Sequence, residues 1–339
     1  MSLLTPGFWY QTRPNWLARA LLPVSWFYGI AVGLHRRSSR PWPCGLPVLS
    51  IGNLTLGGTG KTPLGIALAQ GLDRRGWRVA VLLRGHGSLP GESRLVGPAS
   101  RLEDAGDEAL EYRRSLGDGR VWVGRNRCQS AVLAKAAGAD LILLDDGMQH
   151  WPLARDLDLS LLDVHHKLGN RLVFPAGPLR EPLDQLARAD WLVLTGADSP
   201  DLVATPPTEW PAAKPWFQVR FCLEPPTQLM GKPLVAFCGI GLPQKFFAAL
   251  RNSGLEVLAT ESFPDHHVYA ERELHSLLDL AHANGALLVS TVKDGQRLPD
   301  WFKNQVTLAP LRVDPTSLEP LLAQLDRRLA ALVGRRDHA

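Results

Sequence analysis

No Asp or Glu occurs before Asp73 in this chain of 339 residues. The same stretch carries six basic residues, namely Arg13, Arg19, Arg36, Arg37, Arg40 and Lys61. The whole chain has 37 basic and 33 acidic residues, so beyond this stretch the acidic residues slightly outnumber the basic ones. A positive charge confined to one arm argues against a nucleic-acid-binding surface and favours a local anionic partner.

Cysteine is scarce. The four cysteines, Cys44, Cys128, Cys222 and Cys238, lie far apart and form no Cys-x-x-Cys pair. A secreted disulfide framework needs more closely spaced cysteines, and a structural zinc site needs paired Cys or His ligands. We therefore expect four reduced thiols in a cytosolic protein.

The sequence also lacks an apolar run of the length that spans a membrane. Residues 20–34 carry no charge, but a spanning helix needs about 20 apolar residues. Pro23 interrupts the run, and proline disfavours a continuous helix. The residues that follow, 34–37, offer no small-residue cleavage site of the kind that ends a secretory signal.

Aromatic and basic side chains surround this run. The aromatic residues are Trp9, Trp16, Trp26, Phe27, Tyr28 and Trp42. Such residues beside arginines are typical of a helix that lies at an anionic membrane surface. We interpret residues 1–40 as a membrane-associated arm. The alternatives are an ordinary helix packed on the domain and, less favoured, a single membrane span.

Residues 48–63, Val-Leu-Ser-Ile-Gly-Asn-Leu-Thr-Leu-Gly-Gly-Thr-Gly-Lys-Thr-Pro, form the strongest single motif. A short apolar strand, a glycine-rich loop, Lys-Thr and a helix hold the phosphates of a nucleoside triphosphate, with Lys61 on the phosphates and Thr62 on Mg²⁺. Thr55 stands where the strict pattern has glycine. The predicted nucleotide-binding residues are Thr55, Leu56, Gly57, Gly58, Thr59, Gly60, Lys61 and Thr62.

Residues 139–150 form the second strong motif, an apolar strand that ends in Asp145 and Asp146. An acidic strand paired with a phosphate loop holds Mg²⁺ directly or through water. The alternative is two solvated acids in a turn. Strands and helices alternate from Val48 to Thr195, which predicts a doubly wound, mostly parallel sheet.

Other candidates in this part of the chain are weaker. Arg84 and the Arg125–Arg127 stretch follow predicted strands, where α/β sheets bind ligands. Asp107 opens a predicted helix and by itself is better explained as an N-cap. Arg180 lies in a Pro/Gly-rich loop, where it either neutralises phosphate charge or pairs with Glu181.

We expect the kinase-like domain to span residues 41–215, a linking strand region 216–230, and a smaller α/β domain 231–339. In the smaller domain we expect strands at 234–238, 256–260 and 286–291, and helices at 243–252 and 271–283. Its loops at 263–267 and 291–295 follow strands and are expected to face a cleft. His266 is a candidate acid/base or orienting residue, with surface histidines as the alternative.

Together these motifs resemble the tetraacyldisaccharide 4'-kinases of lipid A biosynthesis, in the family's order and over nearly the whole chain. The matching residues are 50–55, 57–63, Arg84-Gly85, Gly106-Asp107-Glu108, Asp145-Asp146-Gly147-x-Gln149-His150, 175–182, Phe263-x-Asp265-His266-His267 and Lys293-Asp294. His86 and Ala109 depart from residues that the family often has, Tyr and Pro.

The resemblance implies transfer of the γ-phosphate of ATP to the 4'-hydroxyl of tetraacyldisaccharide 1-phosphate, giving lipid IVA. It implies that Asp107 orients and deprotonates the hydroxyl with His266 as partner, and that Arg180 stabilises charge. Thr62, Glu108, Asp145 and Asp146 are the implied Mg²⁺ shell. Arg125 or Arg127 contacts substrate, and spacing does not choose between them.

These inferences predict a monomer with ATP and Mg²⁺ as cofactors, a glycolipid substrate and no nucleic-acid partner. The enzyme is expected at the cytoplasmic face of the bacterial inner membrane. Two other classes fit parts of the sequence: a soluble P-loop kinase for a small metabolite, and a nucleotide-binding switch protein. A switch protein often ends its acidic strand in Asp-x-x-Gly, which the tighter Asp145-Asp146-Gly147 does not match.

Overall fold

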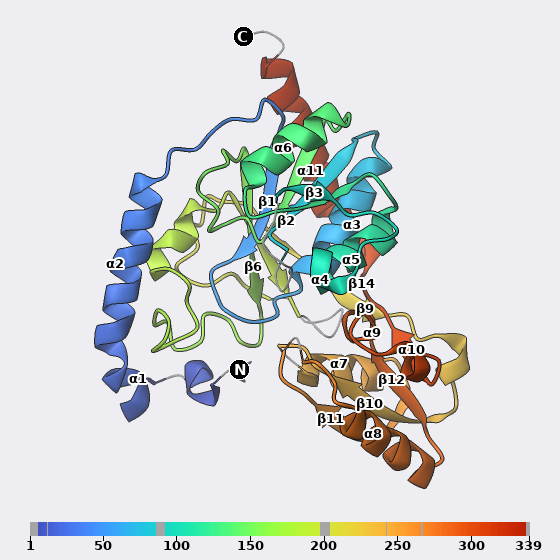
Figure 1. Ribbon diagram of the computed structural model, residues 1–339. Helices are drawn as coiled ribbons and strands as arrows, with labels where there is room; N and C mark the ends of the chain where they lie inside the picture. Colours follow the sequence, from blue (N-terminus) through green and yellow to red (C-terminus); the bar gives the residue numbers. More distant parts are fainter. Residues whose placement is uncertain are drawn as a thin grey trace. The chain divides into compact units, whose positions relative to one another are not determined.

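The computed structural model describes residues 6–11, 13–85, 92–196, 204–241, 243–265 and 267–336 (Figure 1). The chain divides into two compact units. The large unit comprises Pro6–Arg220 and the segment from Asp314 onward, and the small unit comprises Phe221–Val313. The predicted position 266 and residues 86–91, which include His86, lie outside the described residues.

The large unit is built on one eight-stranded sheet in the order β3-β4-β2-β5-β1-β6-β7-β8. All neighbouring strands are parallel except β3, which runs antiparallel to β4 at one edge. The strands are β1 (Val48–Asn53), β2 (Val79–Leu83), β3 (Arg94–Leu95), β4 (Val121–Val123), β5 (Leu141–Asp145), β6 (Leu157–Asp163), β7 (Trp191–Thr195) and β8 (Trp216–Gln218). The prediction of a large, mostly parallel sheet is therefore confirmed.

Helices cover both faces of this sheet (Figure 1). They are α3 (Lys61–Asp73), α4 (Leu102–Ala105), α5 (Asp107–Leu116), α6 (Arg127–Ala136) and α11 (Pro315–Arg336), with the 3₁₀ helix η2 (Leu183–Arg188). Central strands β1, β2 and β5 are buried throughout, as expected for parallel strands between two helical layers. Asn126 caps α6 by accepting a hydrogen bond from the Gln129 backbone N–H, which fixes where that helix begins.

The N-terminal arm consists of the 3₁₀ helix η1 (Gly7–Tyr10), α1 (Trp16–Ala20) and α2 (Leu22–Ser38). One face of α2 packs on the loop between β6 and η2. There Ser25 Oγ accepts a hydrogen bond from the Ala176 N–H, and the Tyr28 ring packs edge-on against Phe174. The arm is thus docked on its own unit through a helix face that is largely apolar and aromatic.

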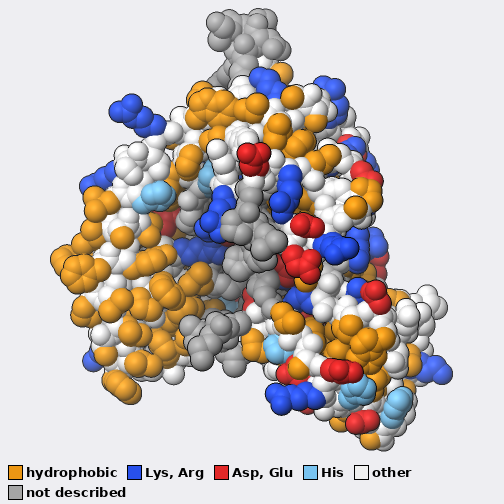
Figure 2. Space-filling view, viewed as in Figure 1, with side chains coloured by type: hydrophobic (Ala, Val, Ile, Leu, Met, Phe, Trp, Pro, Cys, Tyr) orange, Lys and Arg blue, Asp and Glu red, His pale blue; other side chains and the backbone are white. Residues whose placement is uncertain are grey.

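The opposite face of α2 is also apolar, but it is exposed. Trp26 and Phe27 are 68% and 67% exposed, and Ile30 and Leu34 lie one and two turns further along. Figure 2 shows hydrophobic side chains gathered over α2. Among the described residues, no helix combines the length and apolarity needed to cross a bilayer.

The small unit has a four-stranded parallel sheet in the order β11-β10-β12-β13. Its strands are β9 (Phe221–Leu223), β10 (Pro233–Cys238), β11 (Glu256–Ser262), β12 (Leu287–Thr291), β13 (Val306–Ala309) and β14 (Leu311–Val313). Its helices are η3 (Thr227–Leu229), α7 (Pro243–Asn252), α8 (Glu271–Ala283), α9 (Val292–Gly295) and α10 (Asp300–Lys303). Alternate residues of β10 pack towards α7 and α8 in two separate cores.

Two boundaries differ from our expectations. The expected linking strand region 216–230 contains two strands that belong to different units: β8 joins the large sheet, whereas β9 pairs antiparallel with β14 in the small unit. The chain leaves the large sheet at Arg220, whose guanidinium pairs with Asp314 at 2.7 Å. The last helix, α11, belongs to the large unit rather than to a domain 231–339, because it packs on α3 and β8.

Candidate active site

The phosphate loop lies between β1 and α3, as its motif predicts. Gly57 and Gly60 have φ values of +115° and +85°, a region that side chains disfavour and glycine adopts freely. Thr55 is buried and bridges to Leu179, and the Leu56 N–H donates to the Pro178 carbonyl at 2.7 Å. Lys61 is the first residue of α3, so the loop leads into a helix N-terminus that favours anions.

Strand β5 brings the two aspartates to this loop. It pairs with β1 in parallel, with Asp145 beside Ile51, so both strands end at the same edge. The approach is close at Gly52, where an added Cβ would lie 2.4 Å from the Met148 Cβ. Glycine at position 52 is thus required for the segment after Asp146 to pack against β1.

Asp146 lies between two cations. Its carboxylate accepts hydrogen bonds from Arg180 Nη1 at 2.8 and 2.9 Å and lies 3.6 Å from Lys61 Nζ. Burial opposes its ionisation, but Lys61 and Arg180 outweigh that effect and hold the pKa of Asp146 well below its usual range. Its φ of +50° is uncommon for a residue other than glycine. Strain of this kind is often found at functional sites.

Asp145 has the opposite electrostatics. It is buried, and burial together with the charge of Glu108 raises the pKa of Asp145 to about 7. Tyr112, fully buried on the same face of α5, lies close enough to Asp145 and Glu108 for both charges to raise the pKa of its phenol, after burial itself. Two carboxylates in a buried site favour a cation beside them.

Arg127 and His150 form a second pair at this edge. Arg127 Nη1 lies 3.0 Å from His150 Nδ1, and since an arginine only donates, His150 accepts there and carries its hydrogen on Nε2. That Nε2 is buried and has no partner among the described residues. Burial, and then Arg127, Arg155 and Arg84, lower the pKa of His150 to about 3, so its ring is neutral. Arg125, in contrast, is exposed.

Arg180 and Glu181 do not pair with each other. Arg180 pairs with Asp146, whereas buried Glu181 accepts from Arg188 at 3.1 Å and from Gln149 Nε2 at 2.9 Å. The ion pair within the Arg-Glu sequence, our alternative for Arg180, is therefore wrong. Gln149 also contacts Arg180 and the Asn53 carbonyl, so it links the phosphate loop to the Arg180 loop.

Asp107 is buried and is the first residue of α5, one position beyond the cap residue Gly106. Its Oδ1 accepts a hydrogen bond from the Glu108 N–H at 2.9 Å. Among the described residues no three His, Cys, Asp or Glu side chains converge closely enough to hold a metal by themselves. The oxygen donors Thr62, Asp145 and Asp146 nevertheless fit Mg²⁺, which binds through one or two carboxylates plus phosphate and water.

The motif residue Asp294 has a structural place in the small unit. We expected residues 291–295 to be a loop facing a cleft, but Thr291 caps the short helix α9, which residues 292–295 form, and Asp294 is fully buried. Its Oδ1 accepts from the Gly239 N–H at 3.0 Å and from Tyr269 Oη at 2.7 Å, and lies 3.0 Å from Arg297. The Arg297 guanidinium donates to the carbonyls of Gly239 and His267. This Asp294 hub thus anchors the backbone at Gly239 and His267.

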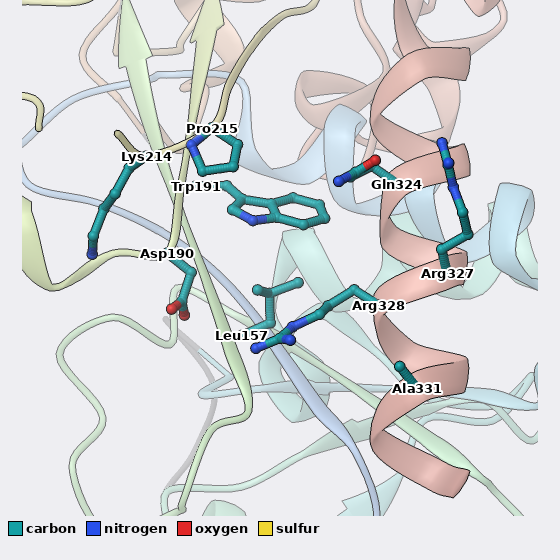
Figure 3. Close-up of a pocket in the computed structure, with 9 residues that line it drawn as sticks. All are labelled: Leu157, Asp190, Trp191, Lys214, Pro215, Gln324, Arg327, Arg328 and Ala331. Atoms are coloured by element: carbon teal, nitrogen blue, oxygen red, sulfur yellow. The ribbon is translucent and has the colours of Figure 1, made fainter. Parts of the chain in front are cut away.

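A groove of about 520 Å³ lies elsewhere in the large unit (Figure 3). Leu157 and Trp191, which begin β6 and β7, line it together with Arg327 and Arg328 of α11. Lys214 at its rim donates to the carbonyls of Ala187 and Ala189. The groove is at the amino ends of strands, whereas the phosphate loop follows a carboxyl end, so it is not the nucleotide site.

Known proteins match this arrangement over nearly its whole length. A family model described as tetraacyldisaccharide-1-P 4'-kinase matches residues 17–330. A tetraacyldisaccharide 4'-kinase of Rhodospirillum rubrum is 40% identical over 329 residues, covering 94% of this chain and 97% of the relative. A Methylobacterium protein of the same name is 41% identical and covers 97% of each chain. The chain belongs to the tetraacyldisaccharide 4'-kinase family.

A solved structure supports the same assignment. It is the "apo" form of LpxK from Aquifex aeolicus in complex with ATP, with a TM-score of 0.71 and 29% sequence identity. The match covers 92% of this chain and 99% of that one. The resemblance drawn from the motifs is thus confirmed, and the protein is a tetraacyldisaccharide 4'-kinase by family.

In this kinase the structure adds residues that we had given no role. Asn53 accepts a hydrogen bond from Lys61 Nζ at 3.0 Å, and Tyr112 closes the site behind Asp145. The sequence signal for Tyr112 is its spacing, one helical turn after Glu108. Asn53 and Gln149 belong to the matching motifs. The hydrogen bond from Gln149 to the Asn53 carbonyl joins residues that are far apart in the sequence, so no local pattern indicates it.

Proposed function

We propose that this protein transfers the γ-phosphate of ATP to the 4'-hydroxyl of tetraacyldisaccharide 1-phosphate, which yields lipid IVA. The observation that carries the proposal is the gathering of Lys61, Arg127 and Arg180 around Asp145 and Asp146 at the end of the phosphate loop. Cations and carboxylates gathered at one site suit a triphosphate with its metal. The family membership supplies the acceptor.

The charged groups divide the work. Lys61 and Arg180 neutralise the phosphates, and in phosphoryl transfer such positioning and charge neutralisation carry most of the rate. Burial, with Arg84 adding to it, lowers the pKa of Arg127 to about 10, while Asp145 and Asp146 favour its charge. The buried Nε2–H of His150 is a donor for an anionic oxygen of the substrate. We assign the substrate contact to Arg127 rather than to the exposed Arg125.

Mg²⁺ fits the oxygen donors Thr62, Asp145 and Asp146, with Glu108 nearby. When bound, the metal neutralises phosphate charge as it does in other phosphate-loop kinases. What the protein provides by itself is a buried carboxylate whose pKa is raised to about 7 by burial and by Glu108. A cation beside Asp145 favours its ionised form.

Asp107 is proposed to align the acceptor hydroxyl. Because a carboxylate with a pKa of about 4 is a weak base towards a sugar hydroxyl, positioning is its main contribution, and His266 acts as its partner. The test is transfer of radiolabelled phosphate from ATP to a purified lipid disaccharide. Asp107→Ala is expected to lower turnover by about 10²–10⁴-fold with ATP affinity nearly unchanged.

The result also separates this function from its alternative. An unchanged rate in Asp107→Ala would refute the role of that residue. Transfer to a small soluble sugar with none to the lipid disaccharide would favour a soluble kinase for a small metabolite.

We also propose that the arm holds the enzyme, as a monomer, on the cytoplasmic face of the inner membrane. The exposed Trp26 and Phe27 lie on one face of α2, and Arg13 and Arg19 precede it, which suits an interfacial helix. Trp26→Ser with Phe27→Ser is expected to weaken binding to anionic phospholipid vesicles at least about tenfold. Val132→Ser, at an exposed apolar position of α6, is the matched control. If the Trp26→Ser/Phe27→Ser variant and the Val132→Ser control bind vesicles equally well, the arm does not hold the enzyme on the membrane.

A further inference from the structure

The first turn of the arm is inserted into the large unit beside the phosphate loop. Trp9 is buried, its indole N–H donates to the Pro175 carbonyl at 3.0 Å, and its own carbonyl accepts from the Asn170 N–H at 2.6 Å. Gly169 has φ +57°, and an added Cβ there would lie 2.5 Å from the Trp9 carbonyl oxygen. Contacts from both sides of Trp9 therefore fix where η1 sits.

The next residue, Tyr10, reaches the loop itself. Its hydroxyl oxygen lies 3.5 Å from the position that a Cβ of Gly57 would occupy. Its ring packs edge-on against His166, with centroids 4.5 Å apart. His166 is in turn held by buried Asp163 at the end of β6, which accepts from its ring Nδ1 and its backbone N–H, both at 2.9 Å.

Gly57 is the least supported part of the phosphate loop. Leu56 is anchored to Pro178, and the Thr59 carbonyl accepts from Thr195 Oγ1 at 2.9 Å. Between these anchors, Gly57 and Gly58 have no hydrogen bond to another described residue. Since Gly57 also has φ +115° and glycine has the widest conformational freedom, the Tyr10 hydroxyl, on the side where a side chain of residue 57 would lie, bounds the space into which this segment can move.

We propose that Tyr10 is a positioning residue for the nucleotide: through Gly57, the first turn of the arm sets the shape of the phosphate loop for a nucleoside triphosphate. Tyr10 packs on His166, which follows β6, whereas Asp145 and Asp146 follow β5, and β1 lies between these two strands. We therefore expect Tyr10 to act on nucleotide affinity. The inference rests on the proposed function only in that a nucleoside triphosphate occupies this loop.

Direct binding of a non-hydrolysable ATP analogue with Mg²⁺, measured by calorimetry on the full-length protein, tests this without any acceptor. Tyr10→Ala is expected to raise the Kd about five- to tenfold, and Tyr10→Phe, which keeps the ring on His166, by about twofold. His166→Ala is expected to match Tyr10→Ala, and the double variant to add little, because both act through one contact. In transfer assays the change is expected in KM for ATP, with kcat nearly unchanged.

Phe8→Ala is the matched control, because Phe8 is an aromatic residue of the same turn that packs on Trp9. It is expected to leave the Kd within about twofold. An equal loss in Phe8→Ala and Tyr10→Ala would reduce Tyr10 to a docking contact and overturn the proposal, as would an unchanged Kd in Tyr10→Ala. The protein could bind the ATP analogue in a way that depends on Tyr10 and yet fail to phosphorylate the lipid. That result would refute the proposed function but would support the inference about Tyr10.

Discussion

Both units bury a charged cluster, but the two clusters are arranged differently. The Asp294 hub of the small unit joins one carboxylate to one guanidinium, and both carboxylate oxygens have partners. In the large unit like charges gather: Asp145 lies near Glu108, and Arg127 near Arg84. Their pKa values shift towards the neutral forms, to about 7 for Asp145 and about 10 for Arg127.

The difference separates a structural cluster from a functional one. A buried ion pair of opposite charges whose carboxylate oxygens all have hydrogen-bond partners needs no further ligand. Like charges held together cost free energy, and a bound anion with its metal relieves that cost. Burial of a charge alone is therefore a poor sign of function. The repulsion between neighbouring like charges is a better one.

The largest expected effect is on the balanced hub. Asp294→Asn leaves the buried Arg297 without its counter-charge, so the free energy of unfolding should fall by about 3–5 kcal/mol. Chemical denaturation followed by hydrogen exchange within the small unit measures it. Arg312→Ala, which removes an exposed ion pair with Glu224 in the same unit, is the control and should cost less than about 1 kcal/mol. Equal losses in the two variants would contradict a structural hub.

Substitutions in the charged cluster of the large unit should lower the rate of phosphate transfer more than the free energy of unfolding. Lys61→Ala removes a cation from the phosphates, so turnover should fall by about 10²–10³-fold. Asp146 keeps Arg180 as its partner, so the free energy of unfolding should change by less than about 1 kcal/mol. Phosphate transfer and urea denaturation measure the two effects. A loss of stability as large as that of Asp294→Asn would erase the contrast between the clusters.

The smallest effect is a pH dependence that only the large unit should show. The pKa of Asp145 is about 7 in the folded protein against 3.8 for an ordinary aspartate, so the folded state retains a proton that the unfolded chain has lost. The contribution of Asp145 to the free energy of unfolding should therefore fall by about 2 kcal/mol between pH 5 and pH 7. His150, whose pKa is lowered to about 3, is neutral in the folded protein but protonated in the unfolded chain at pH 5, so it contributes a rise of about 2 kcal/mol over the same range.

Asp146 adds nothing in this range, because its pKa is lowered and its contribution disappears only in more acidic solution. Thermal denaturation of the nucleotide-free protein measures the slope. Asp145→Asn should remove the falling contribution, so that the stability of the variant rises between pH 5 and pH 7 through His150. A pH profile unchanged from that of the wild type would show that Asp145 does not titrate in this range.

Local chemistry explains which parts of the site could be predicted from the sequence. The phosphate loop and the acidic strand are short segments whose residues act on one ligand, so Lys61, Asp145 and Asp146 stand out in the sequence and lie together in the structure. Alternating apolar strands and helices predicted the mostly parallel sheet for the same reason, because each βα unit carries its own pattern. The untested roles of Asp107 and His266 stay predictions.

The parts of the site that could not be predicted from the sequence depend on contacts between segments that are far apart in the chain. Tyr10 meets His166 and Gly57 only once the arm has docked, and nothing near Tyr10 in the sequence indicates it. The Arg-Glu sequence at 180–181 suggested a pair of neighbours, yet each side chain found a partner elsewhere. Asp294 looked like a loop residue facing a ligand because burial, which decides its role, is set by the whole small unit.

The place of α11 has a consequence for how the protein is made. Residues 221–313 are an insertion whose first and last strands, β9 and β14, lie side by side. Because a chain emerges from the ribosome in sequence order, the small unit is complete before α11 appears. The nucleotide-binding unit, although it begins first, must wait for α11 to cover α3, where Leu322 packs against Gly71. A chain that ends just before residue 314 and has left the ribosome would therefore hold a finished insert within an unfinished host.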